Sequence, residues 1–198
     1  MTAHRVRRIG VYGGTFDPIH NGHLTAAEQI LRLCHLDLVL FVPTGQSWQK
    51  TTTTSADDRL EMVRLALQAH PHCEVSTVDT DRSGATYTVD TLQQLRLQYP
   101  QDELFFILGN DAYAGMSSWK DAHRITELAQ LIVMLRANRT EGGGFPAEPG
   151  VNLVQIDALP ISATEIRQRI QHGESVVGLV PPAVSRFISD HKLYGVSA

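Results

Sequence analysis

The sequence predicts an α/β fold in which a doubly wound, Rossmann-like parallel sheet carries helices on both faces. Short apolar runs alternate along the chain with segments whose apolar residues recur at helical spacing. This alternation is typical of parallel strands joined by crossover helices. Because ligands in such sheets bind at the carboxyl ends of the strands, function is expected at the strand-to-helix junctions.

The first half of the chain begins with a predicted strand at residues 6–12. This apolar run ends at Gly13 and Gly14, which predict a tight turn. A helix is expected from Gly22 onward, because its apolar residues form one stripe: Leu24, Ala27, Leu31 and Cys34.

A second strand is predicted at residues 38–42, where Pro43 stops it. A loop rich in Thr and Ser follows at 44–55. Ser55 is expected to cap a helix whose buried face carries Leu60, Val63 and Leu67.

The second half repeats this scheme of strands and helices. Further strands are expected at 74–78, at 104–108, within 128–135 and at 151–156. A helix is expected at 89–99 and a flexible loop rich in Gly and Pro at 142–150. The tetrapeptide Ser162-Ala163-Thr164-Glu165 predicts a last helix that opens with a capping box.

Length and composition indicate one globular domain. The chain has 198 residues, of which 42% are hydrophobic and 19% are charged, enough for a single large core. We expect one domain over 1–198, in which residues from about 180 to 198 form a C-terminal helical segment.

Charge and hydropathy argue against several classes of partner. The net charge is −4 and the one basic run, at residues 5–8, is short, so nucleic acid binding is not expected. The longest apolar stretch, 36–42, is far shorter than the roughly 20 residues of a membrane-spanning helix. Cys34 and Cys73 form no CxxC pair, which excludes a zinc ribbon. We expect a cytoplasmic protein; its oligomeric state is not readable from these patterns.

The first unusual junction runs from Gly13 to His23. Two glycines after a strand let another group approach the backbone closely and free N–H groups to point at it. His20 and His23 then begin a helix, where the N–H groups and the helix dipole favour an anion. The junction therefore predicts a phosphate site that is neither a G-x-G-x-x-G loop nor a Walker A loop. The alternatives are a plain turn with solvated histidines and a metal site built on the histidine pair.

The second unusual junction runs from Ile161 to Arg167. Ser162 and Thr164 offer hydroxyl groups at the start of a helix, and Arg167 lies one turn further on the same side. Hydroxyls and a guanidinium at a helix N-terminus can bind an anion. The alternative is a plain capping box beside a surface arginine.

Both junctions resemble signatures of the nucleotidylyltransferase superfamily. Residues 14–23, which read GTFDPIHNGH, are similar to its H/T-x-G-H signature, and residues 161–167 are similar to I-S-S-T-x-I-R. Ala163 replaces the second Ser, which removes one hydroxyl. The resemblance implies ATP binding by Gly14, Thr15, Phe16, His20, His23, Ile161, Ser162, Thr164 and Arg167. It also implies a catalytic role for His20, His23 and Arg167.

Within the superfamily the chain resembles the bacterial nicotinate-nucleotide adenylyltransferases over essentially its whole length. Residues 86–92 match the Y-T-x-D-T-L stretch of that family, and residues 180–194 are similar to its C-terminus. Gly109 and Asp111 match its G-x-D, in which the Asp binds the adenosine ribose.

The resemblance also implies residues for the second substrate and for the phosphates. Nicotinate mononucleotide is expected at Thr15, Tyr87, Thr88 and Trp119, with the indole stacked on the pyridine ring and Trp48 as a second candidate. Lys50 is expected to face a phosphate and act in catalysis, and Arg136 to approach the adenosine.

The implied reaction transfers AMP from ATP to nicotinate mononucleotide and releases pyrophosphate, by direct in-line attack without a covalent intermediate. Mg²⁺ is expected, held mainly by substrate phosphates and with no protein metal site. Preference for the nicotinate over the nicotinamide substrate is attributed to backbone amides near Thr88 and Trp119. The alternatives are a pantetheine-phosphate adenylyltransferase, a cytidylyltransferase, a non-catalytic nucleotide-binding module and a metal hydrolase.

Two polar clusters outside these motifs receive no function. Asp79, Asp81 and Arg82 are expected to form a solvated, paired loop. His70 and His72, with the neighbouring cysteine, straddle a helix end and a strand start without further ligands.

Overall fold

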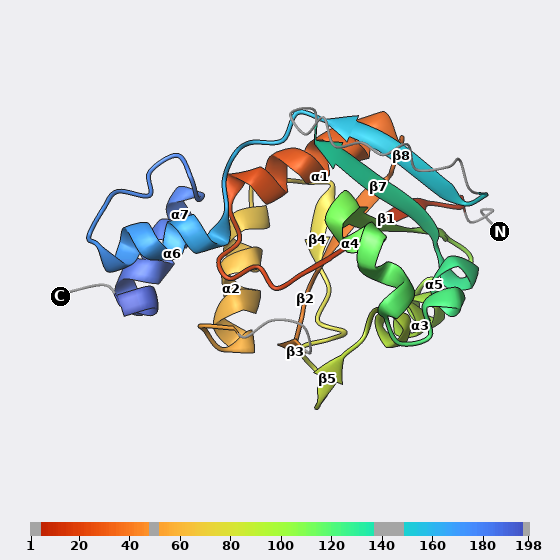
Figure 1. The fold of residues 1–198 in the computed structure, drawn as a ribbon, viewed down its shortest axis with the longest axis horizontal. Helices are drawn as coiled ribbons and strands as arrows, with labels where there is room; N and C mark the ends of the chain where they lie inside the picture. The colour runs from red at the N-terminus through yellow and green to blue at the C-terminus, as the bar shows by residue number, and fades with distance from the viewer. Residues whose placement is uncertain (1–4, 48–51, 137–148, 196–198) are drawn as a thin grey trace.

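The computed structural model describes residues 5–47, 52–136 and 149–195. Within these ranges the main sheet has six parallel strands in the order β4-β2-β1-β6-β7-β8 (Figure 1). This topology confirms the predicted α/β fold. The strands are β1 (Arg8–Gly14), β2 (Leu38–Pro43), β4 (Cys73–Val75), β6 (Glu103–Gly109), β7 (Gln130–Arg136) and β8 (Val151–Ile156).

Helices cover both faces of this sheet and give the molecule two apolar cores. One core joins α1 (Asn21–Leu33) and α2 (Ala56–Leu67) to the sheet and includes α6 (Ala163–Gln171) and α7 (Pro182–Asp190). The other core joins α3 (Thr88–Gln98) and α5 (Ala122–Leu128) to the opposite face. In Figure 1, α6 and α7 lie beyond α1 and α2, away from the strands.

Side chains of β2 alternate between the two cores. Val39 and Phe41 belong to the core with α1 and α2, whereas Leu38, Leu40 and Val42 belong to the core with α3. Since successive side chains of a strand point to opposite faces, a continuous apolar run is what a strand covered on both sides requires.

The chain reverses its direction of travel across the sheet at β1. It proceeds from β1 to β2 and β4 on one side, then returns to place β6, β7 and β8 on the other. The carboxyl ends of β1 and β6, at Gly14 and Gly109, therefore flank the crevice where such folds bind ligands.

The structure corrects the predicted start of the chain. The first strand is Arg8–Gly14 instead of 6–12, so both glycines belong to the strand and not to the turn. The turn comes two residues later, where Phe16 has a φ of 50°. The strand extends beyond the apolar run through the glycine pair, because β1 stays paired with β2 as far as Gly14.

Other differences concern short elements. The strand predicted at 74–78 is only Cys73–Val75. The elements that were not predicted are α4 (Asn110–Gly115), η1 (Met116–Ser118), α5 and the paired strands β3 (Gln46–Ser47) and β5 (Ala85–Thr86). Two-residue strands carry no periodicity that a sequence could reveal. Most of the loop predicted at 142–150 lies outside the described residues.

The C-terminal segment contains α7 and the short helix η2 (Leu193–Gly195), and Tyr194 of η2 is buried in the core with α2. Across the described ranges, no helix has the length and apolar character needed to cross a membrane.

Candidate active site

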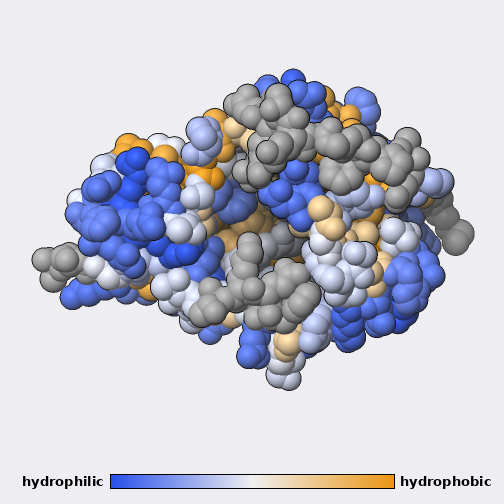
Figure 2. All heavy atoms as spheres, in the orientation of Figure 1, coloured by the Kyte–Doolittle hydropathy of each residue, from blue (hydrophilic) through white to orange (hydrophobic). Residues whose placement is uncertain are grey.

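A cavity of about 620 Å³ lies at the carboxyl ends of β1 and β6. In Figure 2 it is visible as a hollow near the centre of the face, with apolar residues in orange and tan at its floor. Most of the residues predicted for the site line this cavity: Gly14, Thr15, Phe16, His20, His23, Tyr87, Thr88, Gly109, Trp119, Ile161, Ser162, Thr164 and Arg167.

Asp111 is the one predicted site residue that has a described side chain and does not line the cavity. Asp111 is exposed in the first turn of α4 (Asn110–Gly115), beside Gly109 at the rim of the cavity. Arg136 is the last residue of β7, and its side chain falls outside the described part of the structure, as do Trp48 and Lys50 altogether. Their roles stay predictions.

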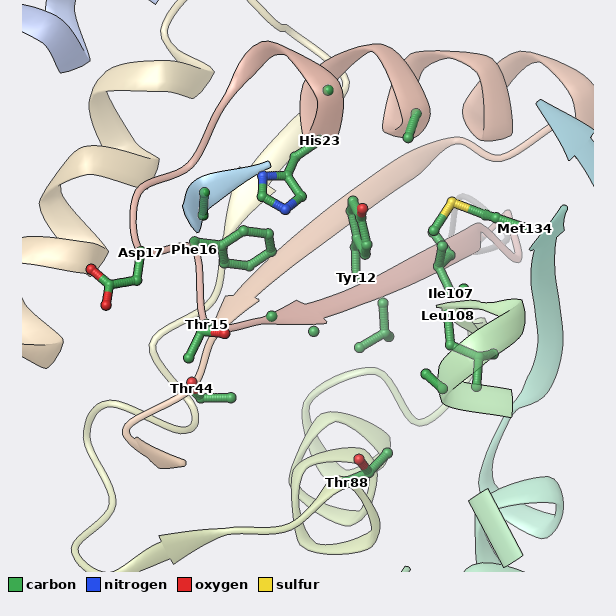
Figure 3. A pocket seen from close by; sticks show the side chains of 18 of the residues that line it. Tyr12, Thr15, Phe16, Asp17, His23, Thr44, Thr88, Ile107, Leu108 and Met134 are labelled. Atoms are coloured by element: carbon green, nitrogen blue, oxygen red, sulfur yellow. The ribbon is translucent and has the colours of Figure 1, made fainter. Parts of the chain in front are cut away.

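The loop between β1 and α1 is shaped by aromatic packing. A Cβ on Gly14 would lie 2.8 Å from the ring of Phe16, so only glycine leaves room for that ring. The Phe16 ring meets the His23 ring edge to face at 5.1 Å and the Tyr12 ring at 5.8 Å. Figure 3 shows His23 projecting from the start of α1 over Phe16, so the phenyl ring supports the imidazole from below.

The two histidines form a stacked pair at the N-terminus of α1. Their ring centroids are 3.6 Å apart and the planes are inclined by 22°. His20 is the N-cap residue, and its backbone N–H donates to Nδ1 of His23 at 3.3 Å. Because Nδ1 of His23 accepts this bond, Nε2 is the ring nitrogen that carries hydrogen and can donate to an oxygen in the cavity.

The second junction begins α6 as predicted but does not form the full capping box. The Ser162 hydroxyl accepts from the backbone N–H of Glu165 at 3.1 Å. The Glu165 carboxylate accepts instead from Nε of Arg169 at 3.1 Å, one helical turn further on. The i,i+4 ion pair therefore takes the place of the second half of the box.

Arg167 connects the two junctions. Its Nη1 donates to the backbone carbonyl of Asp17 at 2.7 Å, and its Nη2 lies 3.3 Å from the Thr164 hydroxyl. These contacts fix a guanidinium at the wall of the cavity, and its remaining N–H groups can bind phosphate oxygens.

Asp17, which the sequence analysis did not single out, holds the loop from behind. Its carboxylate points away from the cavity (Figure 3) and accepts bonds from the Thr53 backbone N–H, the Thr54 hydroxyl and the Tyr194 hydroxyl, at 2.7, 2.8 and 2.7 Å. Burial, and then the hydrogen bond to Asp17, raise the pKa of the Tyr194 phenol, so it stays a hydrogen-bond donor. Nothing in the local sequence reveals contacts between residues this far apart.

Arg59 of α2 is a second residue that sequence reasoning missed. Among the described residues it is the largest fully buried side chain, and Nη1 and Nη2 donate to the backbone carbonyls of Thr15 and Gly45 at 2.8 Å each. Burial lowers the pKa of Arg59, and the nearby Asp17 charge opposes that shift. A buried cation thus fixes the loops after β1 and β2.

The far end of the cavity is built from α3 and the turn at Trp119. The Trp119 indole meets Phe106 of β6 edge to face at 6.3 Å. Lys120 binds the Asp90 carboxylate at 3.0 Å and lies 4.8 Å from the centre of the Tyr87 ring. The lysine therefore ties the Trp119 turn to the beginning of α3.

Asp79 corrects the expectation of a solvated loop. Its exposed fraction is 3%, and Oδ1 accepts from the Thr91 hydroxyl at 2.7 Å and from Nη2 of Arg82 at 3.0 Å. Burial raises the pKa of the Asp79 carboxyl to about 6, although Thr91 and Arg82 oppose the shift. The predicted pairing with Arg82 is confirmed, but Asp79 itself is buried and lines the cavity.

Comparison with known proteins places these features in a family context. A family model described as cytidylyltransferase-like matches residues 11–169, a span that contains both junctions. The chain is 48% identical over 189 residues to a probable nicotinate-nucleotide adenylyltransferase of Clavibacter michiganensis subsp. michiganensis, covering 94% of each chain. It is 46% identical over 200 residues to a probable nicotinate-nucleotide adenylyltransferase of Corynebacterium kroppenstedtii, covering 98% of this chain and 94% of the relative.

Solved structures share the fold. Plasmodium falciparum nicotinic acid mononucleotide adenylyltransferase complexed with NaAD matches with a TM-score of 0.78 at 21% identity, covering 96% of this chain and 98% of that one. The same enzyme complexed with APC matches with a TM-score of 0.75 at 20% identity, with the same coverage. At these identities the likeness concerns the fold.

Proposed function

This chain belongs to the cytidylyltransferase-like family and, within it, to the nicotinate-nucleotide adenylyltransferases, and we propose that it transfers AMP from ATP to nicotinate mononucleotide. The products are nicotinate adenine dinucleotide and pyrophosphate, and the step belongs to NAD biosynthesis. The observation that supports this most directly is that residues of both junction motifs line the same cavity as Tyr87, Thr88 and Trp119.

The nucleophile is a phosphate oxygen of nicotinate mononucleotide. It is ionised near neutral pH, so no side chain has to remove a proton. This oxygen forms a bond to the α-phosphorus of ATP while the bond from that phosphorus to the β-phosphate oxygen breaks and pyrophosphate leaves with the electron pair. The task of the protein is to align the two substrates and to stabilise the charge that develops.

Three side chains are assigned to the charge of the triphosphate. Nε2 of His23 and the guanidinium of Arg167 approach the cavity from opposite junctions, and His20 stacks against His23. The N-terminus of α1 and the backbone around Thr15 add N–H dipoles at the same end. Lys50 is a further cation proposed for this end, and Arg136 and Asp111 are proposed for the adenosine.

The metal proposed for the reaction is Mg²⁺, as the divalent ion of a nucleotidyltransferase. The described residues contain no group of three or more His, Cys, Asp or Glu side chains that could hold a metal ion, and the Asp17 carboxylate is occupied by its own partners. Phosphate oxygens and water suit Mg²⁺ better than a protein cage, which fits a metal that arrives with ATP. When bound there, it neutralises charge on the phosphates.

The mononucleotide is assigned to the other end of the cavity. We propose that the pyridine ring stacks on Trp119, with Trp48 as a second candidate, and that backbone N–H groups near Thr88 and Trp119 bind the nicotinate carboxylate. Thr15 and Tyr87 complete this subsite. A small-molecule enzyme of this kind, with neither nucleic acid nor membrane as a partner, is expected in the cytoplasm.

The proposal is tested by identifying the products. Incubation with ATP, Mg²⁺ and nicotinate mononucleotide should yield equal amounts of nicotinate adenine dinucleotide and pyrophosphate, measured by mass spectrometry and a coupled assay. Parallel reactions with 4′-phosphopantetheine and with CTP should yield no transfer. ATP binding without any product would instead identify a non-catalytic binding module, and transfer to phosphopantetheine would identify the related adenylyltransferase.

A further inference from the structure

We propose that Asp79 is a positioning residue for the mononucleotide subsite, because its carboxylate and backbone join the beginning of α3 to the loop that Arg59 holds. The inference rests on the proposed function and extends it to a residue that belongs to neither junction motif. Asp79 acts through its neighbours, so it is not assigned a contact with the reacting atoms.

The first link runs from the Asp79 carboxylate to α3. The Thr91 hydroxyl lies 2.7 Å from Oδ1 of Asp79 and 3.1 Å from the carbonyl oxygen of Tyr87, so two acceptors share one hydroxyl proton. Tyr87 is the N-cap residue of α3 and Thr88 is its first residue. A charged acceptor at Asp79 orients the Thr91 hydroxyl and, with it, the turn that carries the subsite.

The second link runs from the Asp79 backbone to the loop after β2. A Cβ on Gly45 would lie 2.3 Å from the Asp79 carbonyl oxygen, so the two backbones touch and no other residue fits. The Gly45 carbonyl accepts from Nη2 of Arg59, and Nη1 of the same guanidinium donates to the Thr15 carbonyl. Asp79 therefore contacts the loop at Gly45, which Arg59 connects to the loop at Thr15, where the triphosphate is proposed to bind.

Neighbouring charges and burial determine how readily the Asp79 carboxyl ionises. Arg82 faces the carboxylate at 3.0 Å and favours its charge, whereas Asp90 of α3, itself bound to Lys120, opposes it. Burial is the largest influence and raises the pKa to about 6. A carboxyl with a strongly shifted pKa that lines a cavity is a candidate for a functional role.

The sign of the stability effect follows from this shift. An acid whose pKa is higher in the folded state than in the unfolded state contributes stability below its unfolded pKa, near 4, and loses it as the pH rises through about 6. At pH 8 the charge on Asp79 therefore disfavours folding. Asp79→Asn should unfold at a temperature no lower than the wild type at that pH, whereas a purely structural ion pair predicts a lower unfolding temperature.

The decisive experiment compares Michaelis constants across pH. At pH 8 the Asp79→Asn enzyme should show a KM for nicotinate mononucleotide about tenfold above the wild type, the loss expected for one buried charged hydrogen bond, with little change in kcat or in the KM for ATP. The KM ratio of variant to wild type should fall toward one at pH 5, where the wild-type carboxyl is protonated. Taking this ratio cancels the titration of the substrate phosphate.

Two further variants complete the test. Asp81→Asn removes an exposed carboxylate in the same loop, which accepts from the Thr77 hydroxyl, and should leave both KM values unchanged. Thr91→Val removes the hydroxyl link and should raise the KM for nicotinate mononucleotide even if Asp79→Asn folds poorly.

The outcomes separate this inference from the proposed function. Wild-type turnover with a KM ratio near one at pH 8, or a raised ratio that stays constant down to pH 5, would overturn the role of Asp79 alone. A wild type that neither binds nor turns over nicotinate mononucleotide would overturn the proposed function and this inference together.

Discussion

The imidazole of His23 has a defined orientation before any substrate binds. Its Nδ1 accepts a backbone N–H and its ring lies between those of His20 and Phe16, so Nε2–H is presented to the cavity. Preorganised donors of this kind stabilise charge in a transition state without having to reorient during the reaction. The contribution of the His23 Nε2–H group to catalysis can therefore be tested by substitution.

Replacing His23 should abolish most of the activity while leaving the fold intact. His23→Ala removes a donor aimed at developing charge, so kcat for pyrophosphate release should fall by about 10²–10³-fold. His172→Ala, at the exposed C-cap of α6, is the matched control and should retain full activity. Equal activity of the His23 variant, with an unchanged circular dichroism spectrum, would remove His23 from the mechanism.

Trp119 should report the mononucleotide directly. Ring stacking is worth about 1–3 kcal/mol per base, so Trp119→Ala should raise the KM for nicotinate mononucleotide about 5- to 150-fold and Trp119→Phe much less. In a Trp48→Phe background, the fluorescence of Trp119 should be quenched by nicotinate mononucleotide and not by ATP. Quenching by ATP alone would place the adenosine at this wall instead.

Individual residues show where sequence reasoning reaches its limit. The histidine pair and Arg167 belong to contiguous motifs, so their place at the cavity could be predicted from the sequence. Asp17, Arg59 and Asp79 could not, since each acts on partners brought close only by the fold. For example, Tyr194 meets Asp17 across 177 positions of sequence, and no local pattern encodes that contact.

Among the elements, those with a long apolar period were predicted well. The helix expected from Gly22 is α1, with Leu24 and Ala27 buried, and the strand expected at 151–156 is β8. The paired strands β3 and β5 were missed because two residues have no period, yet they carry Thr86 and the approach to Tyr87. Short irregular elements therefore shape the side of the cavity that is proposed for the mononucleotide.

The C-terminal helix η2 should stabilise the first junction through one hydroxyl. Tyr194→Phe removes the buried donor to Asp17, which costs about 1–3 kcal/mol of unfolding free energy. Chemical denaturation should show this loss. Tyr99→Phe, which removes a half-buried hydroxyl at the end of α3, serves as the control and should cost less. Equal losses of unfolding free energy in the two variants would show that the hydrogen bond to Asp17 contributes no extra stability.

At the scale of the whole molecule, the position of the cavity follows from topology. The sheet reverses at β1, the first junction motif follows this central strand, the second follows the edge strand β8, and the cavity opens at the carboxyl ends of the strands. Alternation of strands and helices was enough to predict this placement. The shape of the cavity was not predictable, because residues far apart in the sequence line it, from Val11 to Arg167.

The most direct test of the account is the ratio of kcat/KM for nicotinate mononucleotide to that for nicotinamide mononucleotide, measured as pyrophosphate release with ATP and Mg²⁺. Because the pyridine end is proposed to bind a carboxylate through N–H donors, an uncharged amide should be a poor substrate and the ratio should exceed about 10². A ratio near one would leave the fold and the family in place but contradict the proposed pyridine subsite. No turnover of either mononucleotide would contradict the proposed function itself.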